Sequence, residues 1–285
     1  MVSNLVFMRF ISWLFLLFGV CLQLFLPCVS IAETAWEILA PGMQVARFEV
    51  NSPVPVSDTD ITVLRVDPQK WGLDIATPML ASDSGGMTAR EWSWNRKLAA
   101  VINAGMFGQD HRTHLGFMQV RDQVLSGHVN SYKSVAAFDP RREGLPPFCM
   151  FDLDVPGVSV DSILQDYSSV VQNLRLIKKP GQNRWSQQEK AWSEVALGED
   201  SMGRILFIFC RAPMSMHDFN NKLLSLDLNL VAAQHLEGGP EAQMFVNIDG
   251  QTYEKFGSYE TGFTEHDHNG AAWPVPNVLG VKKLE

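Results

Sequence analysis

The sequence predicts an α+β fold, a single domain with a mixed β-sheet core flanked by a few helices. Short apolar runs with strand character outnumber helical stretches and do not alternate strictly with them. No repeat, low-complexity tract or long linker interrupts residues 33–285. The chain has 285 residues, of which 46% are hydrophobic and 19% charged, so it can bury one large core or at most two small ones.

Strands are expected where short apolar runs are bounded by turn residues. They lie at residues 44–50, 61–66, 98–102, 117–120, 135–138, 148–151, 205–210, 231–236 and 244–248. Asp249 and Gly250 then predict a tight hairpin turn into a last strand at residues 251–256.

Three helices are expected. Thr88 and Glu91 have the spacing of a capping box, so a helix begins there and runs to about residue 96. A second helix begins near Ser215, because the apolar residues that follow, as far as residue 224, fall on one helical face. The third is short and covers residues 160–165.

The first 32 residues are typical of a secretory signal peptide. They contain no Asp or Glu, and the single cation Arg9 precedes an apolar run that ends in Ser30-Ile31-Ala32. The small residues Ser30 and Ala32 predict cleavage after Ala32, which leaves residues 33–285 as the mature domain. An uncleaved membrane anchor is the alternative, since about twenty apolar residues can span a bilayer. The protein is therefore expected to be secreted or periplasmic, in a bacterial envelope.

Charge and cysteine content narrow the classes of partner. The 23 Lys and Arg residues are outnumbered by 31 Asp and Glu, and no basic run is interleaved with aromatic residues. Nucleic acid is not expected as a partner, because binding to phosphate backbones needs a positive surface. Removal of the signal peptide leaves Cys149 and Cys210, which either form a disulfide in an oxidising compartment or pack as two buried thiols.

Motifs of the common cofactor chemistries are missing. The sequence has no Gly-x-Gly-x-x-Gly, no phosphate loop, no Gly-x-Ser-x-Gly and no paired Cys-x-x-Cys or His-Glu-x-x-His. No cofactor is therefore expected. His111 and His114, and separately the stretch 265–268, carry possible metal ligands, but neither group is a complete set and no metal site is assigned.

Two segments place a polar residue and glycines at the end of an apolar run, where side chains often converge on a cleft. Asn103 follows the run 98–102, and its amide either faces a ligand or stabilises a turn. Glu237 precedes Gly238 and Gly239, which lack side chains where the backbone passes close to another group. Glu237 is a candidate general base or nucleophile, and a solvated Glu in a hairpin turn is the alternative.

A third segment combines a cation with the start of a helix. Arg211 follows the strand 205–210, and Ser215 is placed to cap the next helix. A helix N-terminus beside a guanidinium favours phosphate or carboxylate binding. The alternative is an arginine in a surface ion pair next to an ordinary helix cap.

Taken in order, these segments resemble the phosphodiester glycosidase family. The resemblance lies in residues 101–107, in 196–198 with 211–217, in Leu236-Glu237-Gly238-Gly239 and in the tail 269–280. It implies a single α+β domain that hydrolyses a sugar 1-phosphodiester in an envelope or extracellular glycan. Many relatives have Asp-Gly-Gly followed closely by Ser, whereas this chain continues from Glu237 into Pro240 and Glu241.

The resemblance also implies roles for the residues in these motifs. Glu237 would be the carboxylate base or nucleophile, Arg211 with the Ser215 helix start would bind phosphate, His217 would assist proton transfer, and Asn103 would orient a sugar hydroxyl or a phosphate oxygen. The expected substrate contacts are Gly105, Ser215, Asp218, Gly238, Gly239 and Glu241. A non-catalytic module that binds glycan or anionic polymer is one alternative, and a metal-dependent phosphodiesterase is another.

Overall fold

The computed structural model describes residues 36–80 and 86–284. The chain divides into two compact units, Met1–Thr34 and Ala35–Glu285, and the description below concerns the second. The expected signal peptide and its cleavage point lie outside the described residues. Within the described part of the chain, no helix has the length and apolar character needed to cross a membrane.

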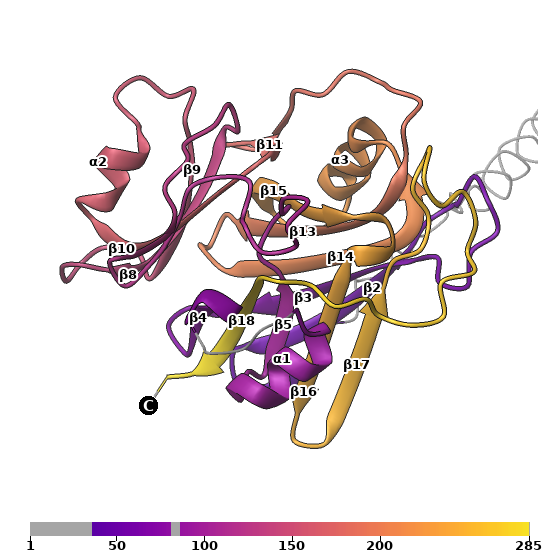
Figure 1. Ribbon diagram of the computed structural model, residues 1–285, viewed down its shortest axis with the longest axis horizontal. Helices are drawn as coiled ribbons and strands as arrows, with labels where there is room; N and C mark the ends of the chain where they lie inside the picture. The colour runs from indigo at the N-terminus through magenta and orange to yellow at the C-terminus, as the bar shows by residue number, and fades with distance from the viewer. Residues whose placement is uncertain (1–35, 81–85, 285) are drawn as a thin grey trace, which may run out of the picture. The chain divides into compact units, whose positions relative to one another are not determined.

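Three antiparallel sheets form this unit (Figure 1). The largest has eight strands in the order β1 (Glu37–Ala40), β2 (Met43–Glu49), β3 (Asp60–Val66), β14 (Ile205–Met214), β13 (Trp192–Asp200), β15 (Leu230–Gly238), β11 (Arg175–Lys178) and β12 (Gln182–Asn183). The second has the order β17 (Gln251–Phe256), β16 (Gln243–Ile248), β5 (Ala100–Asn103), β18 (Val278–Lys283) and β4 (Trp71–Ala76). The third has the order β7 (Gln123–Ser126), β6 (Met118–Val120), β10 (Tyr167–Asn173), β8 (Ser134–Pro140) and β9 (Phe148–Asp152).

The predicted fold class is confirmed. Strands dominate the described residues, and α1 (Ala89–Arg96), α2 (Val160–Leu164) and α3 (Met216–Ser225) are the α-helices there, with two 3-10 turns, η1 (Pro78–Leu80) and η2 (Gly239–Glu241). The strand pairings between these elements are antiparallel throughout. The α+β character therefore comes from three sheets, each with its own helix.

Alternation along β14 explains how one strand joins two cores. Ile205, Phe207 and Phe209 pack into the central cluster between the three sheets, and the intervening Leu206 and Ile208 pack into a second cluster on the opposite face. Successive side chains of a strand point to opposite faces, so a strand covered on both sides reads as a continuous apolar run. Each such side chain contributes about 1.5–3 kcal/mol on burial.

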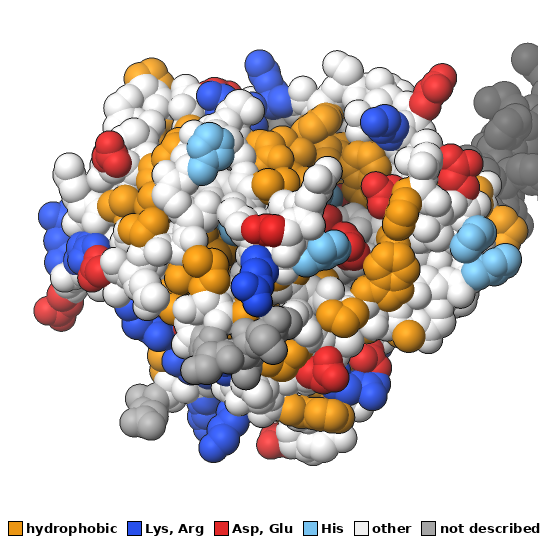
Figure 2. Space-filling view, viewed as in Figure 1, with side chains coloured by type: hydrophobic (Ala, Val, Ile, Leu, Met, Phe, Trp, Pro, Cys, Tyr) orange, Lys and Arg blue, Asp and Glu red, His pale blue; other side chains and the backbone are white. Residues whose placement is uncertain are grey.

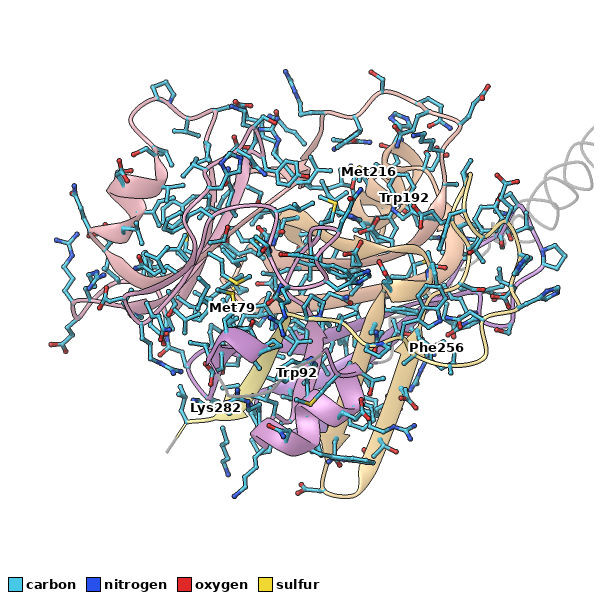
Figure 3. All side chains as sticks on the ribbon, viewed as in Figure 1. Met79, Trp92, Trp192, Met216, Phe256 and Lys282 are labelled. Carbon is cyan, nitrogen blue, oxygen red and sulfur yellow. The ribbon has the colours of Figure 1, made fainter. Side chains whose placement is uncertain are left out.

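Each helix covers the outer face of one sheet. Met216, Phe219 and Leu223 of α3 pack on the eight-stranded sheet. Trp92 of α1 packs on the second sheet, and α2 packs on the third. Figure 3 shows Trp92 on α1, and Trp192 close to Met216 at the start of α3. These contacts leave the ends of the strands, rather than the sheet faces, available for a site.

The local signals at helix starts and at the hairpin are confirmed. Thr88 accepts a hydrogen bond from the Glu91 amide in a capping box at the start of α1. Asp249 and Gly250 have φ values of 47° and 83° between β16 and β17, as a tight hairpin turn of this type requires. Two strand ends differ from the prediction, because β14 continues through Arg211 to Met214 and β15 continues to Gly238.

Cys149 and Cys210 are both free thiols. Cys210 is buried within β14, whereas Cys149 lies 3.7 Å from the Lys179 ammonium nitrogen. Of the two alternatives that the sequence left open, the structure has the unbonded one.

Candidate active site

The end of β15 passes through a narrow gap at two consecutive glycines. A Cβ atom on Gly238 would lie 2.7 Å from the Trp192 ring, and one on Gly239 would lie 2.6 Å from a carboxylate oxygen of Glu260. Gly239 has φ of +62°, a conformation that other residues adopt at a cost. The glycines therefore let the backbone that follows Glu237 pass close to Trp192 and Glu260.

Three carboxyl groups surround this glycine pair. They belong to Glu237, to Glu241 of η2 and to Glu260 in the loop after β17, and none forms an ion pair with another described residue. Burial raises the pKa of Glu237 to about 8, against the opposing charge of His235 and with help from Glu241. Burial also raises the pKa of Glu241 and that of Glu260. Desolvated carboxyl groups with shifted pKa values are typical of acid and base groups in active sites.

A buried histidine and carboxylate pair lies beside these three groups. His235 Nδ1 is 2.5 Å from Glu194 Oε1, and both side chains are at least 95% buried. The second oxygen of Glu194 accepts a hydrogen bond from Trp192 Nε1 at 2.7 Å. Burial lowers the pKa of His235, but the Glu194 carboxylate outweighs this, so the pKa is raised. The pair places a positive charge close to Glu237, and Nε2 is the ring nitrogen that remains for a ligand.

A bulge lies between His235 and Glu237 at the end of β15. In the pairing of β13 with β15, Val195 lies opposite Glu237 and Ala196 opposite His235, so Leu236 is the extra residue. Leu236 is buried in the central core. Bulges often reorient side chains next to active sites.

A cavity of about 350 Å³ opens next to Glu241. It is lined by Gly86, His111, Glu241, Trp273, Pro274 and Pro276. The exposed ring of Phe263 packs against Trp273 with its centroid 6.3 Å away. Figure 2 shows acidic and histidine side chains near the middle of one face, next to a group of exposed apolar side chains. A surface of this composition suits a sugar, which offers both hydroxyl groups and apolar faces.

Asn103 is buried and bonded to the backbone of the site rather than exposed to a ligand. Its Oδ1 accepts a hydrogen bond from the Gln243 amide at 2.7 Å, and its Nδ2 donates to the Glu241 carbonyl at 3.0 Å. The side chain thereby fixes the segment that carries Glu241. The sequence predicted that Asn103 orients a substrate oxygen, whereas its contacts in the structure are those of a positioning residue.

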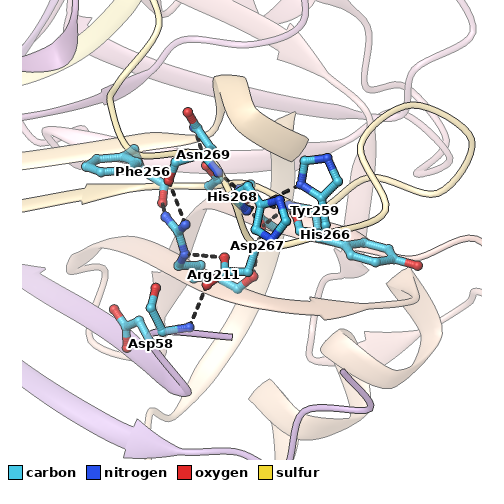
Figure 4. Close-up of polar contacts among 12 residues, drawn as sticks. Asp58, Arg211, Phe256, Tyr259, His266, Asp267, His268 and Asn269 are labelled. Atoms are coloured by element: carbon cyan, nitrogen blue, oxygen red, sulfur yellow. Dashed lines mark hydrogen bonds and ion pairs between the residues drawn. The ribbon is translucent and has the colours of Figure 1, made fainter. Parts of the chain in front are cut away.

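Arg211 holds a loop that borders the site (Figure 4). Its Nε donates to Asp267 at 2.6 Å, and its terminal nitrogens donate to the carbonyls of Phe256 and Asn269 at 2.6 and 2.8 Å. This loop contains Glu260. The guanidinium is 7% exposed and has an acidic partner. The expected phosphate contact therefore has no support from these interactions.

The side chains in the first turn of α3 contact the segment 183–187 rather than the Glu237 segment. Ser215 caps the helix and bonds both Asp218 and Gln187. His217 donates from Nδ1 to the Trp185 carbonyl at 2.7 Å and accepts at Nε2 from Asn221. The Asp218 carboxylate already occupies the helix N-terminus, and Gln187 donates to it. These groups pack the segment 183–187 onto α3.

Gly105 allows the backbone to pass close to the side chains of Asn173 and His114. Its φ is +147°, and a Cβ atom there would overlap Asn173 and His114. His114 is buried, burial lowers its pKa to about 4, and its Nε2 lies 2.9 Å from the Gln172 carbonyl. The rings of His266 and His268 stack on each other with their centroids 4.4 Å apart. Within residues 36–80 and 86–284, no group of three or more His, Cys, Asp and Glu side chains is arranged to hold a metal ion.

Comparison with known proteins identifies the family. A family model described as phosphodiester glycosidase matches residues 96–282, which is well over half of the chain. The chain belongs to the phosphodiester glycosidase family. The matched range includes Asn103, Arg211 and the segment from Glu237 to Glu241. Sequence comparison with curated proteins finds no match.

Solved structures share the fold of this phosphodiester glycosidase family member. The catalytic domain of zebrafish N-acetylglucosamine-1-phosphodiester alpha-N-acetylglucosaminidase, auto-inhibited by its pro-peptide, is 16% identical with a TM-score of 0.63, and the match covers 88% of each chain. A hypothetical protein from Synechocystis is 15% identical with a TM-score of 0.56, and the match covers 84% of this chain and 62% of that one. At these identities the similarity establishes the fold.

Sequence reasoning missed three polar residues that this family member gathers at the site. Glu194 lies inside β13, Glu260 lies in a loop, and His235 stands two residues before Glu237. The nearness of His235 to Glu237 in the sequence was a usable signal. No local signal marks Glu194 or Glu260, since their partners are distant in sequence.

Proposed function

We propose that the protein hydrolyses the glycosyl phosphodiester bond of an envelope or extracellular glycan and that Glu237 is its reacting carboxyl group. The observation that carries the proposal is the Glu237 carboxyl, whose pKa is raised to about 8, among two further carboxyls and the Glu194–His235 pair. Hydrolysis of a glycosyl bond needs one carboxyl group as acid and a second as base or nucleophile. Membership of the family supports the same class of reaction.

The raised pKa assigns the acid role to Glu237 at neutral pH. A carboxyl group with a pKa of about 8 is protonated at pH 7, so it can donate a proton to the oxygen that leaves with phosphate. It is a poor base or nucleophile in that state. Glu241 lines the cavity beside His111 and fits the group that activates water. The His235 imidazolium, paired with Glu194, would stabilise the negative charge that develops on the oxygen that leaves with phosphate.

Release of free sugar tests the proposal. The substrate to try first is methyl N-acetylglucosamine-1-phosphate, because the structurally similar zebrafish protein is named for that linkage. Glu237→Gln keeps the shape of the side chain but cannot donate a proton. We expect turnover to fall by about 10²–10⁴ with the circular dichroism spectrum and melting temperature preserved. Glu143→Gln, an exposed carboxylate outside the site, is the matched control and keeps full activity.

Two outcomes would contradict the proposal. Full activity of the Glu237→Gln variant would remove Glu237 from the chemistry. Binding of the phosphodiester without any release of sugar by the unmodified protein, across pH 5 to 9, would identify a non-catalytic binding module instead.

A further inference from the structure

A basic cavity lies at the start of β11, the strand that pairs with β15. It has a volume of about 440 Å³ and is lined by Ser131, Lys133, Leu174, Arg175, Arg184, Trp185, Ser186, Gln187 and Gln188. Lys133 stands just before β8, Arg175 begins β11, and Arg184 follows β12. Three cations from separate segments of a chain with net charge −8 thus line one cavity.

This basic cavity adjoins the carboxyl cluster. The Leu174 carbonyl at its wall accepts a hydrogen bond from the His235 amide at 2.8 Å. Arg175 lies opposite Gln234 in the pairing of β11 with β15. Tyr132, between two lining residues, is close enough to Glu237 for that carboxylate to add to the raised pKa that burial gives the phenol. A molecule that reached from the basic cavity to the carboxyl cluster would therefore lie along the last residues of β15.

The charges in the basic cavity are not fully balanced by protein carboxylates. Arg175 donates to Asp152 at 2.7 Å and to Asp154 at 2.7 Å, and Lys133 lies 3.6 Å from Asp154. Arg184 has no ion pair or hydrogen bond from its side chain with another described residue. Three cations therefore face two carboxylates, and one positive charge remains for a ligand.

The cavity is also lined by polar side chains that can donate hydrogen bonds. Gln188 Nε2 is buried with no partner among the described residues. The hydroxyl groups of Ser131 and Ser186 line the same wall. Donors together with an unpaired guanidinium match a phosphate group, which has several oxygens and a negative charge.

We propose that the basic cavity binds the phosphate of the substrate, with Arg184 as its principal contact, while the sugar lies over Glu237 and Glu241. This inference rests on the proposed function for the identity of the sugar side, but its phosphate contact is measurable without turnover. Phosphate binding, which the sequence predicted for Arg211 and Ser215, is thereby assigned to Arg184 and its neighbours. Both of those residues already have protein partners.

Titration with inorganic phosphate tests the contact directly. Arg184→Ala should raise the dissociation constant for phosphate at least tenfold, and Arg184→Lys should restore part of the affinity, because charge is kept but the two-pronged geometry is lost. Arg184 is exposed and has no structural partner among the described residues, so its replacement should leave the melting temperature unchanged. Arg142→Ala, an exposed arginine paired with Asp166 outside the cavity, is the control and binds phosphate as the unmodified protein does.

Kinetics with methyl N-acetylglucosamine-1-phosphate separates this inference from the proposed function. Arg184→Ala should raise KM about tenfold with kcat within a factor of two or three, because binding is lost and the reacting groups remain. Phosphate affinity that depends on Arg184 in a protein that releases no sugar would overturn the proposed function and keep the phosphate site. Unchanged phosphate affinity and unchanged KM in Arg184→Ala would overturn the phosphate site, whatever the activity.

Discussion

The pKa of Glu237 is raised by burial and by the charged groups that the fold places around its carboxyl group. Its carboxyl is partly buried, it accepts one hydrogen bond, from the Gly238 amide, and two other carboxyls lie nearby. Burial disfavours the ionised form, and like charges add to that effect, while His235 opposes it. The carboxyl groups of this cluster therefore interact as they titrate, and each affects the pH at which the others lose a proton.

The pH dependence of the rate follows from this pKa. If Glu237 acts as the acid, kcat/KM falls as pH rises through about 8, because deprotonation removes the donor. A profile of kcat/KM between pH 5 and 10 measures this limb, and Glu237→Gln should lack it. A rate that increases through the same range would instead make Glu237 a base or nucleophile, the role that the sequence predicted.

Asn103 should matter for both stability and rate. Asn103→Ala leaves the Gln243 amide and the Glu241 carbonyl without partners in a buried position, at a cost of about 1–3 kcal/mol for each group. Urea unfolding should show the loss, and kcat should fall because Glu241 is no longer held. Asn51→Ala, an exposed residue, is the control. Unchanged stability of Asn103→Ala would refute the structural role assigned to the amide.

Among the elements, the loop after β17 depends on a single side chain for its placement. Arg211 connects this loop to β14 through Asp267 and two carbonyls, and Asp267 in turn accepts a hydrogen bond from the Ser57 amide at 2.6 Å. On the same loop, Gly257 packs against the backbone of Gly239 in η2. Glu260 reaches the glycine pair because both ends of this loop are fixed.

Replacing Arg211 should release that loop. Arg211→Ala leaves Asp267 as an unpaired, largely buried charge, which typically costs about 3–5 kcal/mol. Amide hydrogen exchange in residues 257–269 should accelerate more than exchange in β13 or β15. Arg211→Lys should rescue little, since one ammonium group cannot reach three acceptors spread around a planar guanidinium. Protection of the loop equal to that of the unmodified protein in Arg211→Ala would show that other contacts hold it.

In the molecule as a whole, the candidate site collects the ends of strands from all three sheets. β13 and β15 provide Glu194, His235 and Glu237, the loop after β17 provides Glu260, and residues just before β8 provide part of the basic cavity. The central core between the sheets holds these ends in place. Carboxyl groups at the end of β15 and cations beside the neighbouring strand β11 together suit a substrate with a neutral sugar and a charged phosphate.

The sequence was informative for the elements with local signals. The capping box at Thr88, the hairpin at Asp249 and the apolar run of β14 each identified an element within a few residues. It missed β13, which carries Glu194, Glu199 and Asp200, because charged residues are usually exposed. Here each is buried against a specific partner: His235, Lys179 and Arg204 respectively. Such partners come from long-range folding and leave no local pattern.

The sequence by itself determined the fold class and the family, because both depend on runs of neighbouring residues. Only the tertiary structure decided which polar groups are already used within the protein and which remain for a ligand. Arg211, Asn103 and Ser215 have partners, whereas Glu237 has no ion pair among the described residues and Arg184 lines a cavity without one. A hydrogen bond depends on distances of about 3 Å between atoms that folding brings together, and the order of residues along the chain does not contain those distances.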